Sequence, residues 1–117
     1  MNRHYILENG LPKAVSLLTW AHWLEAQPDR DVKRDKIEGT AIRVITVFLP
    51  LCYVDPQEDG SFKKYFYGTI VRGGAMDDHE EKSVSREEAE DTHEKVLKRV
   101  KAVLAGDIGV PGCCRGG

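Results

Sequence analysis

The densest group of side chains that could do chemistry lies between residues 77 and 81, where the chain reads Asp-Asp-His-Glu-Glu. Carboxylate oxygens together with a histidine nitrogen can bind a divalent cation. On an extended strand, however, Asp77, His79 and Glu81 would face one side and the two remaining acids the other, so at most three groups could converge. A solvated turn that leads into an edge strand explains the same composition, and we assign no metal site.

Signatures of catalysis are missing from the sequence. The histidines, at positions 4, 22, 79 and 93, form no HxxxH or HExxH pair that would place two ligands on one helix face. His93 falls on an apolar helical stripe, where a packed histidine with a hydrogen-bond partner is favoured over a catalytic one. No GxSxG motif is present, and Cys52 is interpreted as a small buried hydrophobic residue. We therefore assign no catalytic residue and no cofactor, and we expect that the protein is not an enzyme.

The turn Arg72-Gly73-Gly74 is the candidate for anion binding. Glycines in a turn can expose backbone N–H groups beside the guanidinium, which would form a small nest for an anion. The sequence lacks the GxxxxGKS pattern of a phosphate-binding loop, and a turn that simply ends a strand is the favoured alternative. Arg72, Gly73 and Gly74 are accordingly the candidate ligand-binding residues.

Three aromatic residues, at 65–67, directly follow Lys63 and Lys64. Such a pattern is typical of surfaces on which nucleic-acid bases stack while lysines bind phosphates. Alternation along a strand places Tyr65 and Tyr67 on one face and Phe66 on the other. A second copy of the chain covering the tyrosine face explains the pattern equally well.

Composition narrows the class of protein further. The 117 residues fit one domain, with 41% hydrophobic and 31% charged residues, as in ordinary globular proteins. A formal net charge of -2 makes nucleic acid an unlikely partner. No apolar run is long enough for a membrane span and no signal-peptide pattern opens the sequence, so we expect a cytoplasmic protein without membrane contact. Three cysteines, two of them adjacent at 113 and 114, build no CxxC motif or disulfide framework.

The first third of the sequence predicts a short strand, a turn and a helix. A strand is expected at residues 3–7, and Asn9-Gly10 is a strong turn signal because both residues tolerate positive φ. Ser16 is a suitable N-cap for a helix that runs to about residue 27. Apolar residues at helical spacing predict a stripe that packs on the sheet core: Leu17, Trp20, Ala21 and Leu24.

The remainder predicts strands followed by a long helix. Strands are expected at residues 31–37, 41–49, 63–71 and 77–84, the second of them apolar on both faces. Ser85 and Glu88 form a capping box, and an apolar stripe follows to Gly106. Its members are Ala89, His93, Val96, Leu97, Val100 and Leu104.

These elements predict an α+β fold, with an antiparallel sheet of about four strands and two helices packed on one face. Residues 1–106 are expected to form a single α+β domain. Residues 107–117, which are rich in glycine, are expected to form a flexible C-terminal tail.

Four segments carry a resemblance to known proteins: a tryptophan helix at 18–25, the strand Ile-Thr-Val-Phe-Leu at 45–49, the aromatic and glycine segment at 65–74, and the helix start at 85–89 with His93 after it. Together, from about Leu18 to Lys101, they resemble a family of short, largely uncharacterised proteins encoded by phages, prophages and other mobile elements. Pro50 and Arg86 stand where that family has glycine and tryptophan. The resemblance implies a shared fold and a mobile-element context rather than an activity.

The leading functional hypothesis is a phage or prophage accessory protein that binds a host protein or a small molecule, for instance to block a host defence. A small nucleotide-binding protein or enzyme that uses the Arg72-Gly73-Gly74 turn with the nearby acidic cluster is one alternative. A structural subunit that acts only in assembly is another.

A homodimer is the expected assembly, because two helices on one side of the sheet would leave an apolar set on the other side. The expected interface residues are Ile45, Val47, Tyr65, Tyr67 and Val71. Aromatic residues of this kind are enriched at interfaces, where an apolar ring meets a hydrogen-bonding edge.

Overall fold

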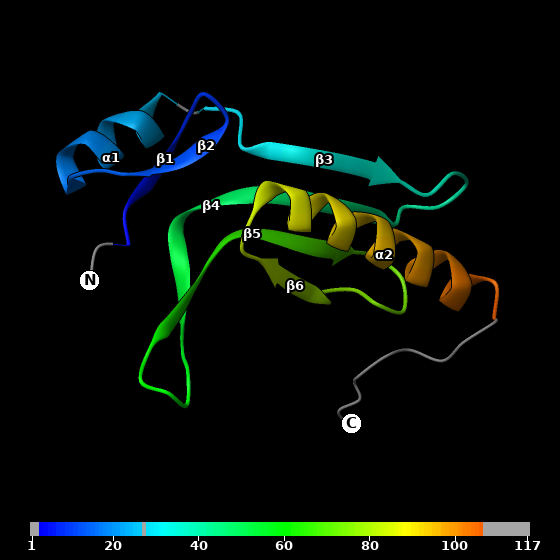
Figure 1. The fold of residues 1–117 in the computed structure, drawn as a ribbon. Helices are drawn as coiled ribbons and strands as arrows, with labels where there is room; N and C mark the ends of the chain where they lie inside the picture. The colour runs from blue at the N-terminus through cyan, green and yellow to red at the C-terminus, as the bar shows by residue number, and fades with distance from the viewer. Residues whose placement is uncertain (1–2, 27, 107–117) are drawn as a thin grey trace.

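The computed structural model describes residues 3–26 and 28–106, which form an α+β structure of two sheets and two helices (Figure 1). The residues expected to form a C-terminal tail, 107–117, lie outside the described part. In chain order the elements are β1 (Tyr5–Glu8), β2 (Leu11–Ala14), α1 (Leu17–Glu25), β3 (Asp31–Lys36), β4 (Arg43–Pro56), β5 (Phe62–Arg72), β6 (Glu80–Ser83) and α2 (Arg86–Leu104).

The main sheet is antiparallel and has the order β3-β4-β5-β6, so strands that are neighbours in sequence pair with each other. The predicted antiparallel sheet of about four strands is confirmed. β4 is longer than expected because it continues past Pro50, through a register shift between Phe48 and Tyr53. A proline has no N–H to donate to a ladder, and the irregular pairing accommodates it. Beyond this point β4 and β5 continue as a hairpin that extends away from the sheet (Figure 1).

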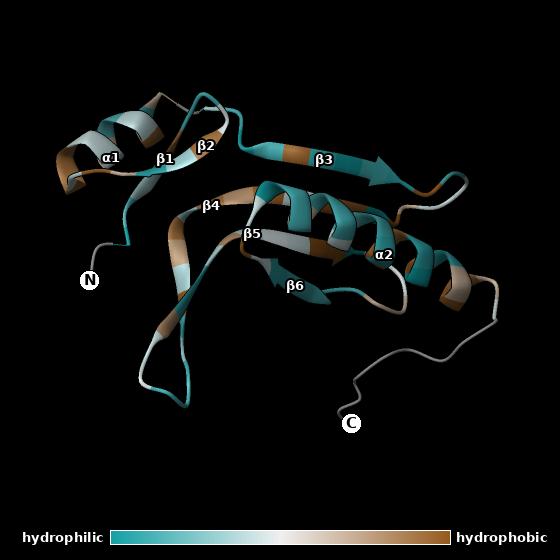
Figure 2. Cartoon of the chain, in the orientation of Figure 1, coloured by the Kyte–Doolittle hydropathy of each residue, from teal (hydrophilic) through white to brown (hydrophobic). Residues whose placement is uncertain are grey.

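α2 is the helix that covers the main sheet, since it contacts all four strands. It begins as predicted after Ser85, whose hydroxyl accepts a hydrogen bond from the backbone N–H of Glu88 at 3.1 Å. Most of the outward side of the helix is hydrophilic (Figure 2), but its last turn is apolar, and Leu104 of the predicted stripe is 53% exposed. The buried members of the stripe are Ala89, His93, Val96 and Val100.

The predicted packing of both helices on one face of the sheet is not confirmed. α1 packs mainly on β1, and none of its residues is fully buried. Trp20, expected in the core, is half-buried beside the β4 irregularity, where its indole N–H donates to the carbonyl of Pro50 at 3.0 Å. Trp23 reaches the core at its margin, with its ring against that of Phe48. Because α2 already spans all four strands, the shorter α1 is left to pack on the β1–β2 hairpin.

The β1–β2 hairpin turns at Asn9 and Gly10, both with positive φ as the sequence predicted. It is tied to the main sheet by a bridge between His4 and Leu51 and by a hydrogen bond from the Cys52 N–H to the carbonyl of Arg3. No helix in the described residues combines the length and hydrophobicity needed to cross a membrane.

The core lies between α2 and one face of the sheet. Cross-strand pairs in register supply it: Val44 opposite Val71, and Phe48 opposite Tyr67. All four residues are buried, and the rings of Phe48 and Tyr67 pack edge to face. Burial raises the pKa of the Tyr67 phenol, whose hydroxyl finds no hydrogen-bond partner among the described residues.

Replacing Phe48 by alanine tests this assignment of the core. We expect a loss of about 3 to 5 kcal/mol in the free energy of unfolding, because a fully buried ring leaves a cavity. Phe62→Ala is the matched control, since that ring is 54% exposed at the start of β5 and its loss should change stability by no more than about 0.5 kcal/mol. Urea unfolding curves measure both values, and equal costs would contradict the core described above.

Candidate functional site

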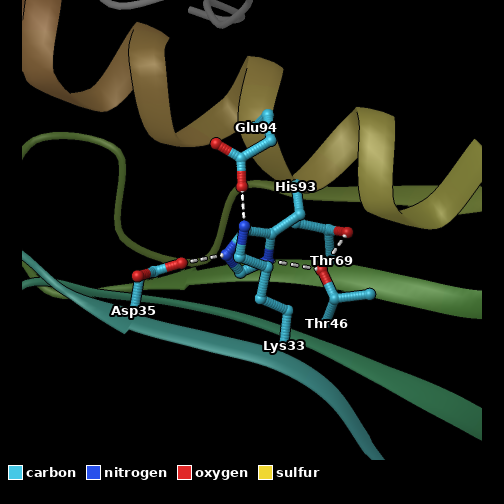
Figure 3. A network of polar contacts seen from close by, with 6 residues as sticks. All are labelled: Lys33, Asp35, Thr46, Thr69, His93 and Glu94. Carbon is cyan, nitrogen blue, oxygen red and sulfur yellow. Dashed lines mark hydrogen bonds and ion pairs between the residues drawn. The ribbon is translucent and has the colours of Figure 1, made fainter.

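The most polar part of the core is a hydrogen-bonded chain that runs from α2 into the sheet (Figure 3). His93 of α2 is fully buried, and its Nδ1 lies 2.8 Å from the hydroxyl of Thr46 on β4. The Thr46 hydroxyl is 2.6 Å from that of Thr69 on β5. On the other side of the ring, Nε2 lies 2.7 Å from a carboxylate oxygen of Asp35 on β3. One helix and three strands are joined through this chain.

The donors and acceptors of the network follow from the chemistry of its groups. A carboxylate only accepts, so Nε2 of His93 carries the proton and donates to Asp35. In the neutral imidazole Nδ1 then accepts from the Thr46 hydroxyl, which in turn accepts from Thr69. Every buried polar atom in this hydrogen-bonded network therefore has a partner, as burial of such groups requires.

An ion pair between two charged side chains lies at the surface end of the network. The Lys33 ammonium binds the carboxylate of Glu94, the residue after His93 (Figure 3). This hydrogen bond raises the pKa of Lys33 and lowers the pKa of Glu94. Both side chains are largely exposed, so the pair adds little to the free energy of folding.

Asp35, His93 and Glu94 are the described residues whose ligand atoms come close enough to hold a metal ion, all within 4.8 Å of one another. A nitrogen with two carboxylate oxygens would suit a divalent cation. The ammonium of Lys33 already neutralises Glu94, and Nε2 of His93 is bonded to Asp35. Metal binding would have to displace both partnerships, so these contacts favour a structural role.

The order Thr46–His93–Asp35 resembles the order of contacts in a hydroxyl, imidazole and carboxylate triad. Such a triad works only if its nucleophile reaches a substrate. Thr46 and His93 both have no exposed surface beneath α2, and the Thr46 hydroxyl is held by its two neighbours. The geometry supports the interpretation of His93 as a packed histidine with hydrogen-bond partners.

The opposite face of the sheet presents a different set of side chains, which we call the open face. α2 covers the other face of the sheet, and α1 packs mainly on β1. Its centre is apolar and half-buried, with Ile45 of β4 paired to Ile70 of β5, and Val47 paired to Gly68. Leu49 lies over Gly68, where an added Cβ would come within 3.4 Å of it. The open face is therefore an apolar strip along the two central strands.

Charged residues flank this strip in cross-strand rows. The first row joins Lys36, Arg43 and Arg72 across β3, β4 and β5. The second row places Arg34 and Glu80 at either end of the Ile45–Ile70 pair. In the third row Asp31 and Lys82 stand at either end of Val47 and Gly68.

The predicted interface residues divide between the two faces. Ile45 and Val47 lie on the open face, whereas Tyr67 and Val71 are buried under α2, so the prediction that they share a face is wrong. The register decides this, because Tyr67 and Val71 pair with Phe48 and Val44 rather than with the other alternate set of β4. Tyr65 is part of the projecting hairpin, paired with Tyr53.

The Arg72-Gly73-Gly74 turn binds its own acidic neighbours. The Arg72 guanidinium donates to Asp78 at 2.6 Å, and the Gly73 N–H donates to the carboxylate of Asp77 at 2.7 Å. Both donors that an anion would need are thus engaged within the turn. This turn also shortens β6, which was expected to start at Asp77 and starts at Glu80. His79 pairs with Glu81 at 2.8 Å.

Sequence reasoning missed the partners of His93: Asp35, Thr46 and Thr69. A signal existed, because Thr46 and Thr69 are polar residues inside otherwise apolar strands and His93 interrupts an apolar helical stripe. Comparison with known proteins yields no match to a family model, a curated protein or a solved structure. The resemblance to mobile-element proteins accordingly stays a prediction.

A pair of threonine substitutions tests the buried network. Thr46→Val should cost about 1 to 3 kcal/mol of stability, because Nδ1 of His93 and the Thr69 hydroxyl lose their shared partner. Thr46→Val with Thr69→Val should cost less than the sum of the two single changes, since the hydroxyls act as a pair. Thr19→Val, at an exposed position of α1, is the control and should change stability by no more than about 0.5 kcal/mol. Strictly additive costs in urea unfolding would show that the network is not coupled.

Proposed function

We propose that this chain is a non-enzymatic binding protein that works as a homodimer, in which two copies stack through their open faces. The observation that carries the proposal is the charge order of the two edges of the open face. Read from the third row to the first, the β3 edge carries Asp31, Arg34 and Lys36, which is negative, positive, positive. The β6 edge carries Lys82 and Glu80, which is positive, negative, whereas the first row ends on β5 with Arg72, whose charge Asp78 offsets.

Opposite signs at the two ends of the second and third rows make the face complementary to a copy of itself. A two-fold axis parallel to the strands, between β4 and β5, would place the β3 edge of one copy over the β6 edge of the other. Arg34 would then meet Glu80 of the second copy, and Asp31 would meet its Lys82. In the centre, Ile45 would lie over Ile70 of the second copy. Stacked sheets of this kind pack about 10 Å apart with nearly aligned strands.

The size of the open face argues for a weak dimer. The axes of the two outer strands are only about 14 Å apart. A face of this width buries a small surface area for a stable protein interface. Arg34 and Lys82 also have partners within one copy, in Asp31 at 2.9 Å and Glu80 at 3.6 Å. Exchanging these exposed pairs for pairs between copies yields little net energy, so burial of the apolar strip has to drive association.

The wider role proposed is that expected from the sequence, an accessory protein of a phage or prophage that binds a host protein or a small molecule in the cytoplasm. A binding role is supported by the burial of the Thr46–His93–Asp35 chain, which offers no nucleophile to a substrate. The alternative of a nucleotide-binding turn at Arg72-Gly73-Gly74 is less favoured, because Asp77 and Asp78 occupy its donors.

A charge exchange tests the proposed dimer. Arg34→Glu alone and Glu80→Arg alone should each weaken association severalfold, because each places like charges opposite one another. The double variant should restore it, since Glu at 34 of one copy then meets Arg at 80 of the other. Light scattering at rising concentration, up to on the order of tens of micromolar, measures the dissociation constant.

The control for this exchange is Lys101→Glu, which changes an exposed charge on α2 and should leave association unchanged. Thermal melts check that all variants fold. A native protein that stays monomeric throughout this range would refute the dimer. If the double variant associates as weakly as the single variants, the proposed placement of the β3 edge over the β6 edge is refuted.

A further inference from the structure

The first row of the open face is a cluster of three cations, and few negative charges lie near enough to offset them. Lys36, Arg43 and Arg72 stand at directly opposed positions on three adjacent strands, about 5 Å apart from strand to strand. Like charges directly opposite one another destabilise a sheet. Arg72 binds Asp78, but Lys36 and Arg43 form no ion pair within residues 3–26 and 28–106.

Two of the three cations line an open hollow at the end of the sheet. Lys36, Ala41 and Arg43 surround a volume of about 370 Å³. The hollow is separate from the Arg72-Gly73-Gly74 turn, whose backbone donors face the acids of their own loop. The side chains of Lys36 and Arg43 are available to a ligand, whereas the Arg72 guanidinium is held by Asp78.

We propose that the Lys36–Arg43–Arg72 row binds a small phosphate-type oxyanion, which bridges two copies of the chain. This inference rests on the proposed dimer. The same two-fold axis that pairs opposite charges in the second and third rows would place Arg43 of one copy over Arg72 of the other. Asp78 offsets Arg72 in each copy, but Lys36 and Arg43 leave each row with a net positive charge, which an anion between the copies would offset.

Phosphate oxygens match this site chemically. A guanidinium forms two parallel hydrogen bonds with a phosphate, and a multiply charged anion offsets several cations at once. Such an anion binds the dimer more tightly than the monomer, because only the dimer presents both rows. By linkage, the anion therefore strengthens association.

Inorganic pyrophosphate is the probe for the test. Light scattering or sedimentation measures the dimer dissociation constant in sodium chloride and in pyrophosphate at equal ionic strength. We expect pyrophosphate to tighten the native dimer by about tenfold, the effect of about one charged hydrogen bond. Arg43→Gln should abolish this response without weakening the dimer in chloride, because it removes a repulsive charge. Lys101→Gln, on the exposed side of α2, should retain the full response.

The outcomes separate the two proposals. A dimer that forms in chloride and does not respond to pyrophosphate overturns the anion site and leaves the dimer standing. An equal response in Arg43→Gln also overturns the site, because it would reflect a general effect of the salt. A protein that is monomeric in both solutions overturns the dimer and the anion site together. A monomer in chloride that dimerises in pyrophosphate, and only when Arg43 is present, supports the anion site and overturns the proposal that the chain dimerises without an anion.

Discussion

His93 lies on the sheet-facing side of α2 and is fully buried. One of its ring nitrogens is hydrogen-bonded to Asp35 of β3 and the other to Thr46 of β4. A buried imidazole without partners would cost several kcal/mol, so α2 can pack only where both partners are within reach. Asp35 and Thr46 must therefore face the same side of the sheet. A slip of one residue in either strand would turn a partner to the other face and leave His93 unsatisfied. The network thus fixes which face α2 covers.

The face that α2 covers determines which side chains of the sheet are left on the solvent-facing side. With Val44, Phe48, Tyr67 and Val71 under the helix, the alternate residues of the same strands are left outside. Ile45 and Ile70 form the apolar centre of that outer face, and opposite charges stand at its two edges. The apolar strip of the open face therefore follows from the same register that builds the core. The buried polar network and the proposed binding surface lie on opposite sides of one sheet.

Local signals in the sequence were sufficient for several elements. Ser85 caps α2, most of its apolar stripe is buried, with Leu104 exposed, and Asn9-Gly10 turns a hairpin, because each of these features depends on residues near in sequence. The face assignment of Tyr67 and Val71 failed for a physical reason. β4 is apolar on both faces, so its pattern does not say which face meets the helix, and only pairing with β5 decides it. Trp20 was likewise assigned to the core from its spacing, whereas the longer α2 takes that position.

Methyl NMR at rising protein concentration tests the central claim, that the open face is the binding surface left by α2. The account predicts that the methyl signals of Ile45 and Ile70 shift and broaden as the concentration increases. Those of Ile42 and Val100, which lie in the core, should stay constant and serve as internal controls. Leu17 and Leu18 of α1 are 61% and 67% exposed and provide the competing apolar surface. Shifts confined to these leucines, with Ile45 and Ile70 unchanged, would contradict the account.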